Sequence, residues 1–312
     1  MHTLEEAFEH DRALVWGIGG SGDVVGAIPT ARLLEAHGVE AVLGGVAWEP
    51  APEDPIVGPR PFEGVTGLDR LTETVGWATP ETTTIDGVPF SESRVADVLD
   101  DRVILIDASK GIRPMIEGME AACERLDIDL VIGTDSGGDA LARGDEPGLQ
   151  SPVSDAMGLV TLEALTVETA LGVFGFGSDG ELTIEELNAG IARAAERDGL
   201  LGAWGITPRI RDEMEAVLET VQTEASRLPV EAARGAIGPR DIRSGNRSLE
   251  LTPTSTITFY FRPESVAESS TLVEPVRDAA GIEDIVEAFA DRGLTTEYEL
   301  ETGRLENVEK RE

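Results

Sequence analysis

The chain has 312 residues, enough to bury a sizeable core, and its 60 acidic against 25 basic residues give a formal net charge of −35. This charge argues against nucleic acids and anionic membrane surfaces as partners, because both would be repelled. The acidic residues occur in every segment, and the only lysines are Lys110 and Lys310. Such a distribution favours a halophilic protein, whose whole surface is adapted to concentrated salt, over a chain with one acidic docking surface.

Several classes of protein are argued against by what the sequence lacks. Residues 1–10 are polar and acidic, unlike a secretion signal, and no apolar run approaches the roughly 18 residues of a membrane span. Cys123 is the only cysteine, so no disulfide can form within the chain. We therefore expect a cytoplasmic protein without a membrane partner.

The first predicted unit is a strand, a glycine-rich turn and a helix. Residues 13–16 are all apolar, residues 17–22 fit the pattern G-x-G-x-x-G, and residues 23–37 have a helical pattern that is followed by Gly38 as its stop. Glycines let an anion approach backbone N–H groups at the positive end of a helix, so a phosphate is the expected ligand. A tight turn without a ligand would give the same pattern. The candidate ligand-binding residues of this loop are Gly17, Gly19, Gly20, Ser21, Gly22 and Asp23.

The following segments alternate between strands and helices. The predicted strands up to residue 206 are 39–48, 103–106, 130–132, 173–176 and 200–206. The predicted helices are 113–126, 151–171, 183–197 and 207–228. This alternation predicts βαβ units, and hence a Rossmann-like three-layer α/β fold with a mainly parallel sheet and helices on both faces.

From residue 229 onward the pattern changes. The sequence predicts a loop at 234–246, a strand at 256–261, a helix at 283–291 and an edge strand at 295–300. No Pro/Gly/Ser-rich linker isolates this part of the chain. We expect a single α/β domain over 1–312, with a parallel-sheet core at about 11–228 and a packed β/α extension at about 229–312.

An acidic residue after the second strand bears on NAD(P) as a cofactor. In dinucleotide-binding folds such a residue contacts the ribose hydroxyls. Glu49 has this place and is a candidate ligand-binding residue, but it lies later than usual, and Asp23 would put a carboxylate beside the pyrophosphate. These two residues weaken the case for NAD(P) without excluding it.

Two charged residues follow the third strand directly. Lys110 lies beside a glycine in a chain that has nearly eliminated lysine, which indicates a role that arginine cannot fill. With Asp107 it is a candidate catalytic pair, as a charge clamp on phosphate or for proton transfer. A surface lysine without function is the alternative.

The loop after the fourth strand, 133–139 (GTDSGGD), is the most informative segment. Asp135 and Asp139 are candidate catalytic residues and candidate ligands of Mg²⁺, which prefers carboxylates, water and phosphate oxygens. In the alternative interpretation, Asp135 closes an Asx turn and Asp139 caps a helix. Three further candidate ligand-binding residues are Gly137, Gly138 and Ser151.

All these loops follow strands, and ligands of open parallel α/β sheets bind outside the carboxyl ends of the strands. We therefore expect the charged residues of these loops to converge, and Ser151 and Asp155 could face the same crevice. The sequence has no metal-binding histidine cluster, C-x-x-C pair, G-x-S-x-G elbow or G-x-x-x-x-G-K-[ST] loop. Histidine-based acid–base chemistry is therefore not expected.

Four segments together resemble the archaeal family catalogued as domain of unknown function 1152. They are residues 17–26 (GIGGSGDVVG), Trp48-Glu49 with Gly58-Pro59-Arg60, residues 133–139, and Gly144-Asp145-Glu146 followed by Ser151-Pro152. The resemblance implies an archaeal origin and an α/β fold. It supplies no activity, substrate or catalytic residue.

The leading hypothesis is a small-molecule enzyme that acts on a phosphorylated or nucleotide-like ligand with Mg²⁺. The 17–22 loop would bind the phosphate, and Asp135 and Asp139 would hold the metal. Two alternatives are an NAD(P)-dependent oxidoreductase and a non-catalytic nucleotide sensor or assembly subunit. A homo-oligomer is compatible with each of them.

Overall fold

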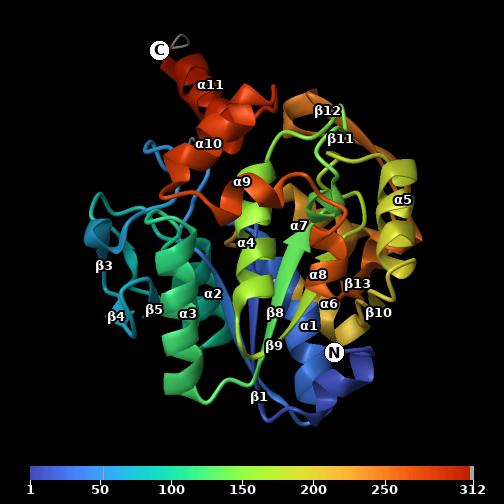
Figure 1. Cartoon of the computed structure of the whole chain (residues 1–312), viewed down its shortest axis with the longest axis horizontal. Helices are drawn as coiled ribbons and strands as arrows, with labels where there is room; N and C mark the ends of the chain where they lie inside the picture. The colour runs from blue at the N-terminus through green and yellow to red at the C-terminus, as the bar shows by residue number, and fades with distance from the viewer. Residues whose placement is uncertain (52, 310–312) are drawn as a thin grey trace.

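The computed structural model of the chain describes residues 1–51 and 53–309, and its centre is a nine-stranded sheet (Figure 1). Five parallel strands form the middle, in the order β9 (Glu168–Phe174), β8 (Leu130–Ser136), β1 (Arg12–Gly17), β2 (Glu40–Val46) and β7 (Val103–Ile106). Antiparallel strands extend both sides: β5 (Val75–Ala78) and β4 (Asp69–Arg70) beyond β7, β13 (Ile257–Phe261) and β10 (Leu200–Gly205) beyond β9. The Rossmann-like α/β fold with a parallel core is thereby confirmed.

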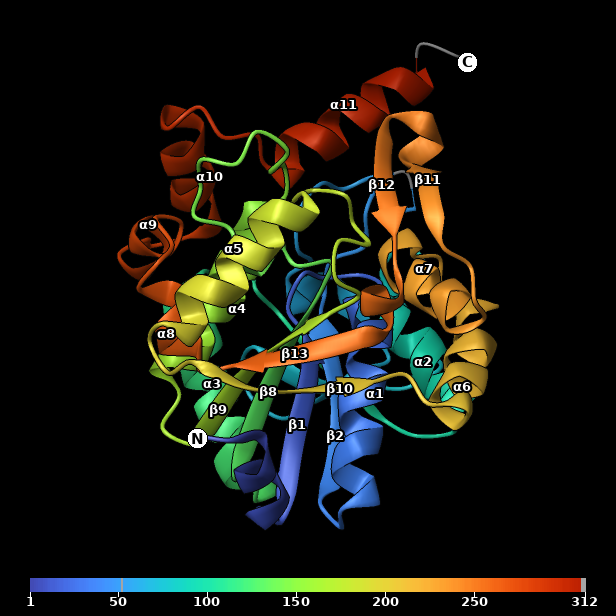
Figure 2. The ribbon, with the colours of Figure 1, turned by 90° about the vertical axis from the view of Figure 1, so that its right-hand side faces the viewer.

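Helices cover both faces of the sheet (Figure 2). One face carries α1 (Asp23–Ala36), α2 (Ser91–Leu99) and α6 (Pro208–Leu218); the other carries α3 (Ile112–Leu126), α4 (Pro152–Ala164) and α5 (Ile184–Ala195). Strand β1 shows that both faces of the sheet are buried. Ala13 and Val15 pack against the helices of the α1 face, and Leu14 and Trp16 pack against those of the α4 face. A strand buried on both faces requires an apolar run instead of polar alternation. Within the described part of the chain, no helix combines the length and apolar character that a membrane crossing requires.

The last third of the chain completes the sheet and covers one end of it. Strand β13 lies between β9 and β10. The remaining elements here are α7 (Glu224–Ala233), the hairpin β11 (Gly238–Ile242) and β12 (Arg247–Leu251), α8 (Pro263–Ala267), α9 (Val273–Arg277), α10 (Ile282–Asp291) and α11 (Glu297–Glu309). Earlier in the chain, β3 (Val65–Thr66) pairs with β6 (Thr83–Thr84). Figures 1 and 2 show the hairpin and α11 at the end of the molecule toward which β8 points.

Two predicted elements of the last third are wrong. The predicted edge strand at 295–300 is instead the end of a loop and the first turn of helix α11, where the Glu299 side chain accepts the N–H of Thr296 at 3.1 Å and stabilises the helix start. The predicted loop at 234–246 contains β11, which pairs with β12 from Gly238 to Ile242. Local composition favoured strand and loop, and tertiary packing overrode both.

Two predicted helices have different limits, and one helix was not predicted. The predicted helix 151–171 ends at Ala164, because the chain pairs with β8 as strand β9 from Glu168. The predicted helix 207–228 is two helices, α6 and α7, and Thr223 caps the second by accepting the N–H of Ser226. Helix α2 lies in a segment for which no helix was expected.

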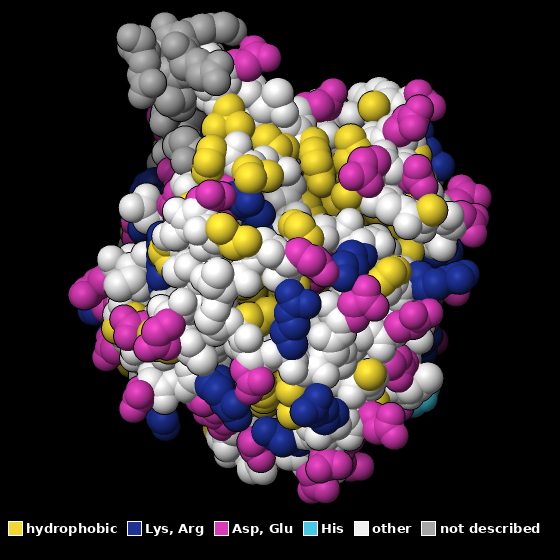
Figure 3. Space-filling model, turned by 90° about the vertical axis from the view of Figure 1, so that its left-hand side faces the viewer, with side chains coloured by type: hydrophobic (Ala, Val, Ile, Leu, Met, Phe, Trp, Pro, Cys, Tyr) yellow, Lys and Arg dark blue, Asp and Glu magenta, His cyan; other side chains and the backbone are white. Residues whose placement is uncertain are grey.

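The acidic side chains are dispersed over the one face of the molecule that Figure 3 draws. On the face drawn in Figure 3, Asp and Glu side chains spread across the whole outline and alternate with Arg and Lys. Many basic side chains are paired; Arg32, for example, contacts both Glu35 and Glu213. This face therefore has no single acidic patch.

The strand order changes direction between β1 and β8. From β1 the chain passes through α1 to β2, and β7 follows on the same side, whereas β8 and β9 lie on the other side of β1. At such a switch point the connections leave over opposite faces, and open α/β sheets bind their ligands there, outside the carboxyl ends of the strands. Gly17 pairs in register with Thr134, so the loops that follow β1 and β8 are neighbours.

Candidate functional site

The turn between β1 and α1 wraps around Asp23, the first residue of that helix. The N–H of Gly19 donates to Asp23 Oδ2 at 3.0 Å, and the N–H of Ser136, at the end of β8, donates to the same oxygen at 3.3 Å. A Cβ on Gly17 would lie 2.4 Å from the backbone carbonyl carbon of Asp23. Glycine at position 17 is thus required for the close turn that brings this carboxylate to the switch point.

The rest of the glycine-rich loop is also engaged with the protein. Gly20 and Ser21 have left-handed backbones, with φ of +80° and +44°, and the N–H of Ser21 donates to the carbonyl oxygen of Trp48 at 2.9 Å. A Cβ on Gly22 would lie 2.2 Å from the Cβ of Thr223. Close packing therefore explains part of the glycine pattern, and phosphate binding by this loop stays a prediction.

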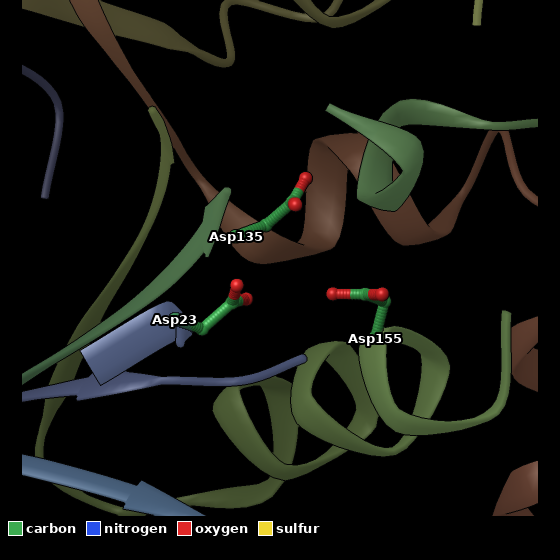
Figure 4. A group of neighbouring side chains, drawn as sticks. All are labelled: Asp23, Asp135 and Asp155. Carbon is green, nitrogen blue, oxygen red and sulfur yellow. The ribbon is translucent and has the colours of Figure 1, made fainter. Parts of the chain in front are cut away.

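Three carboxylates meet at the switch point. Asp23, Asp135 at the end of β8 and Asp155 in the first turn of α4 each offer an oxygen, and these oxygens lie within 4.8 Å of one another. Figure 4 shows the three side chains pointing toward one another from three different elements. Asp135 accepts the N–H of Ala140 at 3.1 Å and, more weakly, that of Gly138 at 3.4 Å. These bonds reach three and five residues along the chain, so they order the loop but are not the Asx turn considered for Asp135, which would bind the N–H two residues on. Of the residues expected to converge, Asp23 and Asp135 lie together here with Asp155.

This triad is poorly compensated. Burial raises the pKa of Asp23 to about 6. Burial, followed by the charges of its acidic neighbours, raises the pKa values of Asp135 and Asp155 well above the usual range of an aspartate. Asp155 is only 6% exposed, and its Oδ1 has no hydrogen-bond partner within the described residues. No ion pair found in that part of the chain reaches any of the three carboxylates, so they require a proton or a cation.

A second group of carboxylates lies beside the first. Asp139, Asp179 and Glu181 each offer an oxygen within 4.8 Å of the others. The charge of Asp155 is the largest electrostatic contribution to the raised pKa of Asp139 after burial itself, so the two groups are electrostatic neighbours. Asp139 opens the short turn after β8, and the other two residues follow β9. The predicted pair Asp135 and Asp139 is thus divided between two groups.

Glu181 differs from the other acids because it is fully paired. Its Oε1 lies 3.2 Å from Arg243 Nη2 and 3.1 Å from Arg247 Nη1, and it accepts the hydroxyl of Ser151 at 2.5 Å. Its Oε2 accepts the N–H groups of Gln150 and Ser151. The predicted ligand-binding residue Ser151 therefore holds Glu181, and its hydroxyl lies 3.5 Å from Asp139.

Gly137 and Gly138 adopt backbone conformations that other residues rarely reach, with φ of +139° and +124°. A Cβ on Gly137 would lie 2.3 Å from the Cγ of Asp179, and one on Gly138 would lie 2.4 Å from Leu187. Gly137 lets the loop after β9 pack directly on the loop after β8 and so brings Asp179 into the site, whereas Gly138 makes room for Leu187 of α5. The predicted contact of the two glycines with a ligand stays a prediction.

Asp107 and Lys110 lie apart from both groups of carboxylates. Asp107 is buried and accepts the N–H of Phe62 and the N–H and hydroxyl of Ser109. Lys110 Nζ lies 3.3 Å from Glu63 and 2.9 Å from Glu73, two exposed acids. The contacts of Asp107 order a loop and those of Lys110 are surface ion pairs, and a catalytic role for either stays a prediction.

Glu49 is fully buried beside the glycine-rich loop. Its Oε1 accepts the N–H of Ser91 at the start of α2 at 2.5 Å, and its Oε2 is 3.4 Å from the Ser21 hydroxyl. Burial raises the pKa of Glu49 to about 7. One of its oxygens is thus occupied by the protein at the position where a ribose contact was considered.

Helix α11 contributes two acids that the sequence analysis did not single out, the half-buried Glu297 and the buried Glu301. Glu297 accepts the N–H groups of Val153 and Ser154 at the start of α4, and burial raises its pKa to about 7. Glu301 accepts the indole N–H of Trp48 at 2.9 Å. These residues and the two arginines of the hairpin carry no motif, so only the fold could have revealed them.

The comparisons with known proteins concern nearly the whole chain. A family model with the description Protein of unknown function (DUF1152) matches residues 14–305. This range includes both groups of carboxylates, the glycine-rich loop and helix α11 up to residue 305. Among curated proteins, none is similar enough in sequence to count as a match.

Proposed function

We propose that this chain, which belongs to the DUF1152 family, is an enzyme that uses a divalent cation, in the first place Mg²⁺, to act on a phosphorylated or nucleotide-like small molecule. The cation would be held by Asp23, Asp135 and Asp155. The site lies at the switch point of a Rossmann-like sheet, where such folds bind ligands.

One observation supports the proposal most directly. Asp155 Oδ1 is buried without a hydrogen-bond partner among the described residues and points toward two other carboxylates (Figure 4). A buried ionised carboxylate without a partner is strongly unfavourable, and the charges of the two neighbouring carboxylates add repulsion. A hard divalent cation with oxygen ligands removes both costs, and oxygen ligands are what the three residues offer.

The proposed ligand class follows from what a cation at this place could do. Mg²⁺ keeps part of its coordination for water and phosphate oxygens, and it neutralises charge that develops on a phosphoryl group. Two positive side chains are close by, because Arg243 and Arg247 both contact Glu181. They are also partly accessible, with 28% and 11% of their side chains exposed. We assign these two arginines, together with the glycine-rich loop, to contact with the phosphate.

Calorimetric titration with Mg²⁺ in molar KCl tests the cation site. Wild-type protein should bind Mg²⁺, and Asp155→Asn should weaken binding by roughly 100-fold or more, since even outer partners of metal ligands contribute about 10–100-fold. Asp278→Asn, an Asp→Asn change at an exposed position, serves as the matched control and should leave the affinity unchanged. Equal affinities for wild type and Asp155→Asn would contradict the proposal.

The ligand class needs a separate measurement. Mass spectrometry of small molecules released from protein purified in high salt should detect a phosphorylated compound. Added ATP or inorganic phosphate should raise the melting temperature only when Mg²⁺ is present. Stabilisation of the protein by NAD(H) without Mg²⁺ would instead favour the oxidoreductase alternative.

A further inference from the structure

We infer that Asp139 and Asp179, supported by Glu181, hold a second divalent cation beside the first, so that the site is a two-cation centre. This inference rests on the proposed function. It extends that proposal from one triad to a second group of residues on different loops.

Asp179 carries the inference. It is 6% exposed, and neither of its carboxylate oxygens accepts a hydrogen bond of ordinary geometry within the described part of the chain, although the backbone N–H of Glu181 is close enough to lower its pKa. It is nevertheless held in place, because its Cγ occupies the space that a Cβ on Gly137 would require. Asp179 thus offers a buried and fixed carboxylate that lies within 4.8 Å of two other carboxylates. A ligand of a divalent cation would be placed in the same way.

Glu181 has a different part in this group. Both of its oxygens are already engaged, by the guanidinium groups of Arg243 and Arg247 and by the backbone and hydroxyl of Ser151. These contacts fix its orientation, as outer partners fix the orientation of metal ligands. Asp139 and Asp179 would therefore supply the protein ligands, and Glu181 would support them from beside the cation through its fixed position.

Charge balance favours two cations over one. The two groups hold six carboxylates, and Arg243 and Arg247 are the basic residues that form ion pairs with them among the described residues. When all six carboxylates are ionised, one divalent cation leaves two negative charges that need protons, and without those protons a phosphorylated ligand would be repelled. With two cations the six carboxylates are balanced. Nearby, Arg304 is opposed by Glu301, and Glu297 is compensated by the start of α4.

The chemistry of the proposed ligand fits such a centre. Two adjacent divalent cations can stabilise both the attacking and the leaving oxygen in a displacement at phosphorus. The triad of Asp23, Asp135 and Asp155 and the group of Asp139, Asp179 and Glu181 are joined by the short loop 135–139, so the cations would be neighbours. The inferred substrate class is a phosphate ester or anhydride.

Mn²⁺ binding to the intact chain tests the inference. Equilibrium dialysis and electron paramagnetic resonance in molar KCl should give two Mn²⁺ per wild-type chain, with signals broadened by interaction between the ions. Asp179→Asn should bind one Mn²⁺ with a simple signal, and Asp278→Asn should bind two. One Mn²⁺ per wild-type chain, or two in a folded Asp179→Asn variant, would overturn the inference.

Further variants separate this inference from the proposed function. Asp155→Asn should lose the first cation. If one Mn²⁺ binds to wild type and is lost in Asp155→Asn but kept in Asp179→Asn, the proposed function stands and the second cation is refuted. If Mn²⁺ does not bind at all, both fail. Circular dichroism verifies folding, and Asp139→Asn provides an independent test of the second cation if Asp179→Asn does not fold.

Discussion

Replacing Asp179 by Asn should stabilise the metal-free protein at pH 8 and should reduce the stabilisation that the protein gains from a divalent cation. The change keeps the shape of the side chain, so the packing on Gly137 is retained. It removes the ability to ionise. Burial and the charge of Glu181 raise the pKa of Asp179 from its ordinary value of 3.8 to about 7.

The raised pKa fixes the sign and size of the effect. Between pH 3.8 and about 7 the folded protein binds more protons at Asp179 than the unfolded chain, so stability is lost as the pH rises through this window. At roughly 1.4 kcal/mol for each pKa unit, ionised Asp179 costs the folded protein about 4 kcal/mol at pH 8. A buried amide without partners costs about 1–3 kcal/mol, so the net gain in the variant is about 1–3 kcal/mol.

Scanning calorimetry in molar KCl can measure this effect. At about 2 °C for each kcal/mol, Asp179→Asn should melt about 2–6 °C above wild type at pH 8 in EDTA. At pH 4 the order should reverse, because wild-type Asp179 is then largely protonated. With Mg²⁺ at pH 8, wild type should gain more than the variant. If the variant is less stable in EDTA by the same amount at pH 4 and pH 8, the reasoning about this buried charge is refuted.

Four further changes test other parts of the structure. Dilution from molar to millimolar KCl should unfold the chain, because the screening of a net charge of −35 is lost; circular dichroism that stays unchanged would contradict the halophilic interpretation. Burial raises the pKa of Glu49 to about 7, so its ionisation lowers the stability of the wild type as the pH rises from 4.5 to 7. In Glu49→Gln the melting temperature should therefore fall less over this pH range in calorimetry; the same fall as in wild type would count against this. Lys110→Arg should change the free energy of unfolding by less than about 0.5 kcal/mol and leave the Mg²⁺ affinity unchanged, because Lys110 pairs with exposed acids; a clear loss of affinity would instead support its predicted role. Gly137→Ala should lower the free energy of unfolding by about 2 kcal/mol or more, because of the positive φ and the contact with Asp179; an unchanged melting temperature would show that the two loops can move apart.

The parallel core was predictable because strands that are buried on both faces consist of nearly continuous apolar residues. The same regularity made part of the site predictable. Asp23 and Asp135 directly follow strands β1 and β8, and the carboxyl ends of neighbouring parallel strands meet at one edge of the sheet. The same rule applies to Asp155, because helix α4 starts at the edge of the sheet where the loop after β8 ends.

The rest of the site depends on contacts between distant segments. Asp179 precedes a glycine and reads locally as a turn residue, and only the packing of its loop on Gly137 buries it. Arg243 and Arg247 belong to a hairpin that looked like a loop, and Glu297 belongs to a helix that looked like a strand. Short-range propensity carries no information about which segment covers the end of a sheet.

The predicted adaptation of the surface to salt does not explain the buried acidic centre. A carboxylate on the surface costs little in molar salt, because water solvates it and ions screen it within roughly 3 Å. Asp135 and Asp155 gain little from such screening, since they are 1% and 6% exposed, and their desolvation is the largest cause of their raised pKa values. Selection for acidic surfaces therefore does not account for six carboxylates gathered at the switch point. The proposed cation binding would account for them, because bound cations would remove the repulsion between ionised carboxylates at this place.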